Sequence, residues 1–447
     1  MERDLTTGSI WKTMIRFSLP FLLAYFLQTL YGLADLFIIG QFNGVEATTA
    51  VSIGSQVMYM ITVMIVGLAM GTTVMIGQAL GAKKRENASR AIGNTIILFL
   101  CVAVALAIIL TLIVRPIVNV MSTPEEAVEG TVTYLRICFM GIPLITAYNV
   151  ISAIFRGMGD SKSPMYFIAV ACVANIVLDY VFIGALDMGP AGAAFGTLSG
   201  QTISVVVALI TILIRKMGIS LSLKDLRPRW DTMSGIVRVG VPIALQDGFV
   251  QITFLAITIF ANMRGLNDAA AVGVVEKIMG VLFLVPSSML STVSAISAQN
   301  FGAKKYDRAR KTMRYAIYVA VGWGILATVV MEFSANWFVG LFSSSQDVAR
   351  LGGQYLRGYV LDCIFAGVHF CFSGYFSGVS RSGLSLANNL ISTLGVRLPL
   401  AYIASVMFVN TLFPMGLATS AASLVSIAIC AGMFYWLQKK QKIECQS

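Results

Sequence analysis

Two aspartates, Asp35 and Asp179, lie inside long apolar stretches, and each follows a proline, Pro20 or Pro164, by 15 residues. A charged side chain deep in a lipid bilayer is costly, so it is usually paired or lines a water-filled cavity, and it is a candidate for function. If both stretches are membrane helices that begin on the same side, a rise of about 1.5 Å per residue places each carboxyl group about 22 Å from that side. The two carboxyl groups are therefore expected at one depth.

Oxygen atoms of two neutral side chains are expected at the same level. Asn175 lies one turn before Asp179 on the same helical face, and Thr197 lies about 9 Å from the opposite side of the membrane on the next apolar stretch. Na+ takes oxygen ligands, so two carboxylates with an amide and a hydroxyl would suit it. The carboxylates could instead share protons, because neighbouring carboxylates resist being ionised together. A purely structural interpretation is that each aspartate only hydrogen-bonds to a neighbouring helix, which would need no matched depth.

The second half of the sequence also carries charges inside apolar stretches, namely Asp247, Glu276, Lys277, Arg357, Asp362 and Arg397. Arg397 lies near the middle of its stretch, too deep to reach the interface, and it therefore needs a carboxylate partner. Asp362 is the best candidate for that partner. His369, the only histidine, is in such a place more often a hydrogen-bonded core residue than a proton relay. The sequence alone leaves open whether these charges stabilise the fold or take part in function.

The composition indicates that these apolar stretches lie in a lipid bilayer rather than in water. Hydrophobic residues make up 57% of the 447 residues and charged residues only 12%, and the mean hydropathy is +0.81. Soluble domains carry about 25% charged residues, so we expect an all-α integral membrane protein. The net charge of +11 does not indicate nucleic-acid binding, because the basic residues form short clusters between apolar stretches. Twelve stretches are long enough to span a bilayer: 13–40, 50–79, 91–114, 131–155, 164–187, 191–215, 233–262, 270–297, 313–333, 354–378, 385–408 and 413–437.

The distribution of basic residues predicts the topology. Of the 32 Lys and Arg residues, 25 fall at the termini and in the loops of one side, and only Arg115, Arg264 and Arg350 fall in loops of the other. Short loops rich in Lys and Arg stay in the cytoplasm. We therefore predict a multi-pass protein of the plasma (inner) membrane with both termini and the central loop in the cytoplasm.

The sequence contains an internal repeat. Ile76–Lys84 reads IGQALGAKK, and Ser297–Lys305 reads SAQNFGAKK 221 residues later; each ends an apolar stretch and opens a basic loop. Six spans per repeat is an even number, so the halves have the same orientation and are related by a pseudo-two-fold axis along the membrane normal. We expect two six-helix bundles around a V-shaped central cavity: an N-lobe of residues 1–215, a linker of 216–232 and a C-lobe of 233–447.

Methionine and aromatic side chains could line that cavity. They are polarisable and adaptable, which suits flat apolar cations, although most such residues pack against lipid or against other helices. No Walker A sequence is present, so we do not expect ATP to drive transport, and we expect neither an enzyme nor a cofactor. The candidates for the substrate cavity are Tyr31, Phe37, Met64, Tyr148, Gln251, Asp362 and His369.

Four motifs resemble the multidrug and toxic compound extrusion (MATE) family: Asp35–Gly40 (DLFIIG), Arg156–Pro164 (RGMGDSKSP), Asn175–Asp179 (NIVLD) and Gly192–Ala194 (GAA). The resemblance covers essentially the whole chain, including its length, its twelve spans and the repeat. It implies an antiporter that exports organic, mainly cationic and amphipathic, small molecules in exchange for Na+ or H+ by a rocker-switch movement. Such a protein is expected to function as a monomer in the lipid bilayer.

The resemblance also implies which residues couple transport to the cation. Members with a site in the N-lobe use acidic, amide and hydroxyl side chains from helices 1, 4, 5 and 6. Other members place an acidic site in the C-lobe, but here Val250 and Gln251 stand about where its helix 7 acid is expected, which favours the N-lobe. The matching residues are Asp35, Asn149, Asn175, Asp179 and Thr197, with Na+ or a proton held at Asp35 and Asp179. Asn149 reaches this level only if Pro143 bends its helix.

Two other transporter classes fit part of the pattern. A lipid-linked oligosaccharide flippase of the same superfamily shares the two-lobed architecture, but its large anionic cargo would need several basic residues in the cavity, and the first lobe offers only Arg136. A major-facilitator transporter also has two sets of six spans, but its usual loop between spans 2 and 3 contains an Asp-Arg pair, whereas this loop reads GAKKR from Gly81. The flippase is therefore the alternative. The physiological substrate, the choice between Na+ and H+ and the oligomeric state are not predicted.

Overall fold

A computed structural model of the chain describes residues 3–215, 222, 224–343 and 345–446. Within these residues every regular element is a helix, as predicted, and ten helices are long and apolar enough to cross a membrane. Two further pairs of helices pass the same test together, each bent at a short break, so the described chain has up to twelve spans. Residues 216–221 and 223 of the predicted linker lie outside the described residues.

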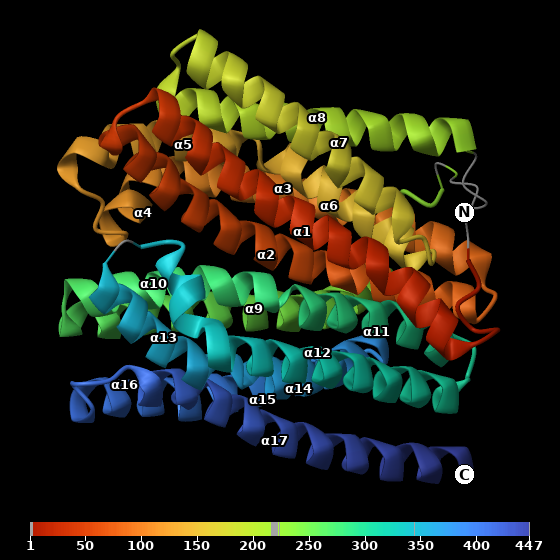
Figure 1. Cartoon of the computed structure of the whole chain (residues 1–447). Helices are drawn as coiled ribbons and strands as arrows, with labels where there is room; N and C mark the ends of the chain where they lie inside the picture. The colour runs from red at the N-terminus through yellow and green to blue at the C-terminus, as the bar shows by residue number, and fades with distance from the viewer. Residues whose placement is uncertain (1–2, 216–221, 223, 344, 447) are drawn as a thin grey trace. The chain divides into compact units, whose positions relative to one another are not determined.

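The helices of the first half follow the apolar stretches of the sequence (Figure 1). α5 and α6 form one of the bent pairs, with an angle of 50° at Gly141, directly before a helix that has Pro143 in its first turn. Proline cannot continue a preceding helix, because it lacks the backbone N–H and its ring clashes with the turn before it. The elements are α1 (Ile10–Phe42), α2 (Val45–Gly81), α3 (Arg85–Leu112), α4 (Val114–Val120), α5 (Glu125–Met140), α6 (Ile142–Gly157), α7 (Lys162–Asp179), η1 (Tyr180–Ala185) and α8 (Gly189–Arg215).

The second half shows the same kind of break. α10 and α11 are bent by 42° at Phe283, shortly before Pro286. The elements are α9 (Trp230–Arg264), α10 (Leu266–Leu282), α11 (Leu284–Gly302), α12 (Tyr306–Gly340), α13 (Gln346–Val360), α14 (Asp362–Gly378), α15 (Ser382–Ser392), η2 (Thr393–Arg397), α16 (Leu398–Met407) and α17 (Phe413–Gln446).

The chain packs as two compact units. The first consists of Leu19–Ala244 together with the residues before Thr6, and the second of Thr6–Ser18 together with the chain from Leu245. The start of α1 therefore packs with the second half of the sequence, and the start of α9 packs with the first half. The lobes predicted from the sequence repeat are 1–215 and 233–447. That these lobes are the parts that move during transport stays a prediction.

One buried side chain, Asn94 on α3, holds the end of the segment that links the two halves. Its Nδ2 donates to the carbonyl oxygen of Arg90 at 3.0 Å and to the carbonyl oxygens of Asp225 at 3.3 Å and Arg227 at 3.4 Å, which share one N–H, and its Oδ1 accepts from the backbone N–H of Arg229 at 2.7 Å. The neighbouring Gly93 lets the segment approach closely, because a Cβ atom there would lie 2.2 Å from the Asp225 carbonyl oxygen. Asn94 thus satisfies three backbone groups that have no regular secondary structure to pair with.

We expect Asn94→Ala to lower the melting temperature of the purified protein in detergent. Loss of this side chain leaves backbone groups of the linker without partners, and an unpaired buried polar group costs about 1 to 3 kcal/mol. Asn87→Ala is the matched control, because Asn87 is an exposed asparagine on the same helix. Equal melting temperatures for the two variants would show that the linker is not held by Asn94.

Candidate functional site

Side chains from α1, α7 and α8 meet at one buried site in the first unit. Thr197 of α8 donates from Oγ1 to Oδ2 of Asp35 on α1 at 3.3 Å, and Asn175 donates from Nδ2 to Oδ2 of Asp179 on α7 at 3.3 Å. The carboxyl groups of Asp35 and Asp179 contact each other, and Asp35 also contacts Asn175. All four side chains are buried, and Asp179 is 0% exposed. The structure brings together four of the five residues that were expected to couple transport to a cation.

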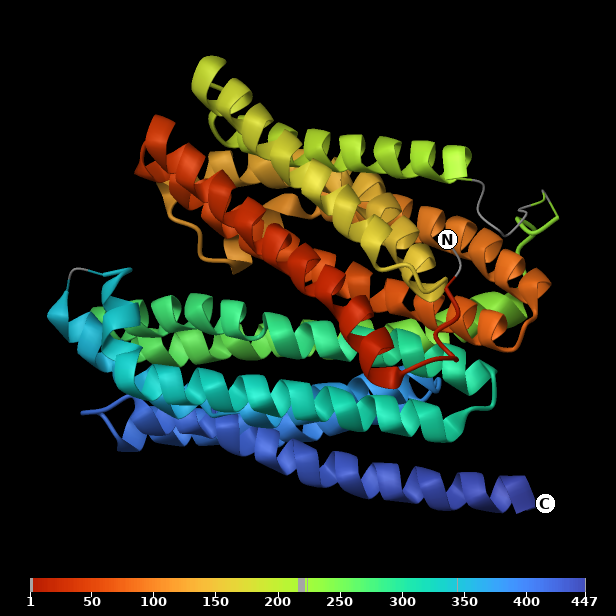
Figure 2. The ribbon, with the colours of Figure 1, turned by 45° about the vertical axis from the view of Figure 1, so that its right-hand side comes forward.

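Two glycines one turn apart, Gly196 and Gly200, allow α8 to approach α7 at this site. The two helices run side by side in both views (Figure 1; Figure 2). A Cβ atom on Gly196 would lie 1.8 Å from Oδ1 of Asp179, and one on Gly200 would lie 3.0 Å from the carbonyl oxygen of Ala171. Small residues at this spacing let membrane helices pack closely. Gly196 was not predicted as a site residue, although the four-residue spacing of glycines in the sequence could have indicated it.

The helix that carries Asp179 changes its winding directly after that residue. α7 ends at Asp179 and continues as the π-helical turn η1, Tyr180–Ala185. π-turns are rare and occur frequently at functional sites, because the wider turn changes the direction in which side chains project. Asp179 therefore lies at the junction of two helical geometries.

Three buried oxygen atoms of the site accept no hydrogen bond from the described residues: Oδ1 of Asp35, of Asn175 and of Asp179. Buried polar atoms are normally paired, so each of these needs an explanation. All three are acceptors, and a second acceptor cannot satisfy them. A hard monovalent cation could satisfy all three, since it takes oxygen ligands, whereas a proton shared by the two carboxyl groups would satisfy the aspartates and leave Oδ1 of Asn175 without a partner. The arrangement can thus bind one positive charge of either kind.

Comparison with known proteins shows the family to which the chain belongs. The family model described as MatE matches the chain twice, over residues 20–181 and 242–403. The chain belongs to the MatE family. The two matches start at equivalent points of the two halves, which confirms the predicted internal repeat.

Relatives and solved structures of similar length match this MatE chain almost end to end. The probable multidrug resistance protein YoeA of Bacillus subtilis (strain 168) is 28% identical over 448 residues, which cover 97% of this chain and 96% of YoeA. The multidrug export protein MepA of Staphylococcus aureus (strain MSSA476) is 22% identical, over 94% of this chain and 93% of MepA. A structure described as the outward-facing conformation of a multidrug resistance MATE family transporter of the MOP superfamily has a TM-score of 0.90 at 24% identity, over 97% of this chain and 98% of that one.

Asn149, the fifth expected coupling residue of this MatE protein, lies on α6 after the bend at Gly141. Asn149 was expected to reach the level of the aspartates only if its helix bends near Pro143, and this bend is present. The side chain of Asn149 donates from Nδ2 to the carbonyl oxygen of Ile145 at 2.8 Å. Within the described part of the chain, no hydrogen bond joins it to Asp35 or Asp179. A coupling role for Asn149 stays a prediction.

The residues expected to line a substrate cavity lie in different surroundings, and their role also stays a prediction. Tyr31, one turn before Asp35 on α1, contacts Thr197 and lies beside both aspartates of the site. It therefore borders the candidate cation site, as its position one turn before Asp35 on the same helical face allows. Of the others, Phe37 is exposed, Met64 and Gln251 are half-buried, and Tyr148, Asp362 and His369 are buried.

In the second unit, Asp362 and Arg397 form the predicted ion pair. Nη2 of Arg397 lies 3.7 Å from Oδ2 of Asp362, and the side chains are 11% and 1% exposed. The Arg397 guanidinium also lies 5.7 Å from the ring centroid of Phe254, which adds a cation–π contact. Opposite charges buried together compensate each other, so this pair differs from the site in the first unit, where two like charges meet.

We expect Gly196→Ala to abolish cation binding at the site while the protein still folds. The new methyl group must displace the Asp179 carboxyl group, because a Cβ atom there would lie 1.8 Å from Oδ1. A bound ligand raises the melting temperature of a folded protein, so the measurement is the melting temperature against Na+ concentration at two pH values. Gly32→Ala on α1 is the control, since a Cβ atom on Gly32 would meet nothing within 4 Å. An unchanged cation response in Gly196→Ala would contradict the site.

We expect Asp362→Asn to reduce stability rather than cation binding. Removal of one partner leaves Arg397 as a buried, uncompensated charge, which typically costs about 3 to 5 kcal/mol. The double variant Asp362→Asn with Arg397→Gln removes both charges and is expected to recover much of the melting temperature. If the double variant is no more stable than the single one, the ion pair is not the reason for the loss.

Proposed function

We propose that this protein is a multidrug efflux antiporter of the plasma (inner) membrane. It exports organic, mainly cationic and amphipathic, compounds in exchange for Na+ or H+. Membership of the MatE family and the names of the relatives, which include multidrug export and multidrug resistance proteins, support export of small organic molecules. We further propose cytoplasmic termini, from the bias of basic residues, and function as a monomer without a cofactor.

The observation that carries the coupling proposal is the contact between Asp35 and Asp179 with its unpaired oxygen atoms. Two like charges in a medium that solvates them poorly repel each other strongly, and one bound cation or proton relieves that repulsion. The only described side chains that donate hydrogen bonds to these carboxylates are the neutral Thr197 and Asn175. The site therefore favours one added positive charge.

The proposed mechanism links this charge to the position of α1. When a cation binds from outside, it offsets one of the two negative charges of the aspartate pair and draws together α1, α7 and α8, which carry its ligands. The repacked α1 lowers the affinity of the cavity for the cationic drug, which leaves, and a rocker-switch movement then exposes the cation to the cytoplasm. Inward movement of one elementary charge gains about 2.3 kcal/mol per 100 mV of membrane potential, and outward movement of a singly charged drug costs the same. The concentration gradient of Na+ or H+ therefore drives export of such a drug, and the membrane potential adds to it only when the drug is uncharged. Because binding is reciprocal, drug and cation must weaken each other by the same factor.

We expect Asp35→Asn and Asp179→Asn each to abolish drug export while leaving the protein folded. The amide keeps the shape of the side chain but removes the charge that a cation or proton must neutralise. The measurement is drug uptake into everted vesicles, with Na+ and pH gradients imposed separately, together with the melting temperature of each purified variant.

Asp187→Asn is the matched control. Asp187 is an exposed aspartate in the loop between η1 and α8, its backbone has a φ of 51°, and asparagine also adopts that conformation readily. Export by the folded Asp179→Asn variant at the normal rate would exclude the site. Drug affinity that is independent of both Na+ and pH in the unaltered protein would exclude the coupling.

A further inference from the structure

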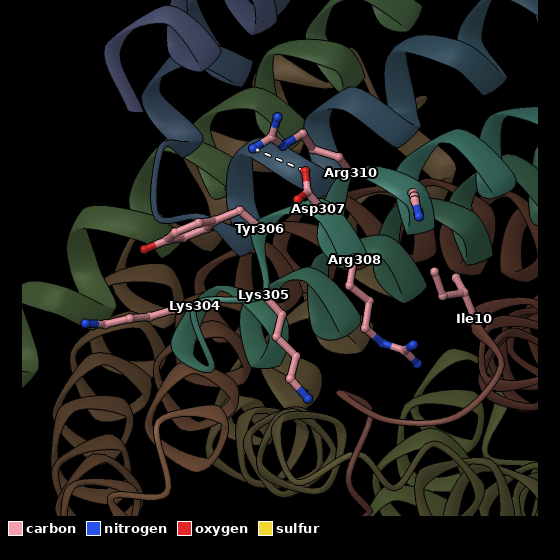
Figure 3. Close-up of a pocket in the computed structure, with 8 residues that line it drawn as sticks. Ile10, Lys304, Lys305, Tyr306, Asp307, Arg308 and Arg310 are labelled. Atoms are coloured by element: carbon pink, nitrogen blue, oxygen red, sulfur yellow. Dashed lines mark ion pairs between the residues drawn. The ribbon is translucent and has the colours of Figure 1, made fainter. Parts of the chain in front are cut away.

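A basic pocket lies at the start of α12, in the second unit (Figure 3). It has a volume of about 450 Å³. Five of the eight residues that line it are basic and one is acidic. Its lining residues come from the loop before α12, from the first turns of that helix and from Ile10 at the start of α1. None of these residues takes part in the candidate cation site.

Two of the basic side chains have a structural task. Nζ of Lys305 donates to the carbonyl oxygen of Thr6 at 2.8 Å, and the guanidinium of Arg308 donates to the carbonyl oxygens of Thr7 at 2.6 Å and Gly8 at 2.7 Å. Figure 3 shows both side chains extending from the same side of the helix start. They hold the segment before α1 beside the pocket, which Ile10 at the start of α1 lines.

The other basic side chains are not neutralised by the one acid. Asp307 pairs with Arg310 at 3.7 Å, and the buried Nε of Arg310 makes no hydrogen bond within the described chain. Lys304 and Lys311 are exposed and have no carboxylate partner among the described residues. The backbone N–H groups of the first turn of α12 have no partner within that helix, and the positive end of its dipole lies there, at the start of α12 where the pocket is. The pocket therefore attracts an anion.

The face of α12 that carries Lys311 continues into the membrane as an exposed apolar stripe. α12 is one unbroken helix (Figure 2). Exposed residues follow each other along it at steps of three or four, the spacing of one helical face: Lys311, Tyr315, Tyr318, Gly322, Leu326 and Val329. An acyl chain that lies along this stripe would place its headgroup at the pocket.

Aromatic side chains mark the level of the membrane interface directly beside the pocket. Trp11, the neighbour of Ile10, packs edge-on against Tyr315, with ring centroids 6.1 Å apart and an interplanar angle of 86°. Both rings are exposed. Trp and Tyr are enriched where hydrocarbon meets headgroups, because their rings are amphipathic. The basic pocket thus lies one helical turn from Tyr315, on the side of the membrane predicted to be cytoplasmic.

From this geometry we infer that the pocket binds the phosphate group of an anionic phospholipid whose acyl chains lie along the exposed stripe of α12. The ammonium groups of Lys304 and Lys311 supply positive charge without a fixed hydrogen-bonding direction, which suits a mobile headgroup. Lys305 and Arg308 hold the segment before α1 beside the pocket. The bound lipid would hold the start of α1 against α12. The inference depends on the membrane-spanning fold and is independent of which cation drives transport.

The double variant Lys304→Gln with Lys311→Gln tests this inference. The unaltered chain and its variants are purified in detergent and titrated with mixed micelles that contain phosphatidylglycerol or phosphatidylcholine, or with inorganic phosphate, while the melting temperature is recorded. We expect phosphatidylglycerol to stabilise the unaltered chain more than either other addition. Loss of two lysines near the headgroup should weaken the apparent affinity about tenfold or more. Lys304→Arg with Lys311→Arg should restore it.

Lys83→Gln with Lys84→Gln is the matched control. Lys83 is the repeat counterpart of Lys304, and the two have nearly the same left-handed backbone, with φ of 59° and 58°. This control removes the same charge from the corresponding loop of the first half and should leave the response to phosphatidylglycerol unchanged. The inference is overturned if both double variants lose the response equally, if neither loses it, or if inorganic phosphate stabilises the protein as well as phosphatidylglycerol does.

Discussion

Hydrocarbon solvates charge poorly, so every charged side chain inside these helices depends on the groups around it. The two units answer this constraint in different ways. In the second unit, Asp362 lies against Arg397, and the opposite charges compensate each other. In the first unit, Asp35 and Asp179 contact each other and receive hydrogen bonds only from neutral side chains of the described chain. The charges of Asp362 and Arg397 in the second unit balance each other, whereas the two aspartates of the first unit need one positive charge. That difference distinguishes the candidate coupling site from a structural ion pair.

Close helix packing is what brings the aspartates together. Asp179 can point between α7 and α8 because Gly196 leaves space for its carboxyl group, and α1 supplies Asp35 from the other side. The α-helical winding also changes at this level, since η1 begins one residue after Asp179. In the second unit the corresponding fifth span changes its winding too, and η2 ends at the charged Arg397. In both halves, a π-helical turn thus accompanies a charge within the membrane, where a change in side-chain direction helps it to reach its partner.

Polar side chains on membrane helices also hold the irregular segments of the chain. Asn94 satisfies backbone groups at the end of the linker, and Lys305 and Arg308 satisfy carbonyl groups before α1. Backbone groups outside helices need such partners, because no regular ladder pairs them. The two contacts differ in consequence. The Asn94 amide has no charge, whereas Lys305 is charged and also belongs to the basic lining of the pocket at α12.

The amino-acid sequence alone determined that the chain lies in a lipid bilayer, that it is helical and that it contains a repeat. It also determined the depth of the charged side chains inside the apolar stretches. Apolar stretches of about 20 residues predict spanning helices, and the fixed rise of a helix converts sequence separation into depth, which placed Asp35, Asn175, Asp179 and Thr197 at one level. The partner of Arg397 could also be named, because a buried charge requires one. The depth of a residue, however, does not specify how its helix is rotated about its axis or which helices pack against it. Only the tertiary structure decided that Gly196 lies against Asp179, that Thr197 donates to Asp35 and that Ile10 of α1 completes a pocket at α12. These contacts join segments far apart in the chain, and packing between helices sets them, whereas the pattern along any one helix leaves them open.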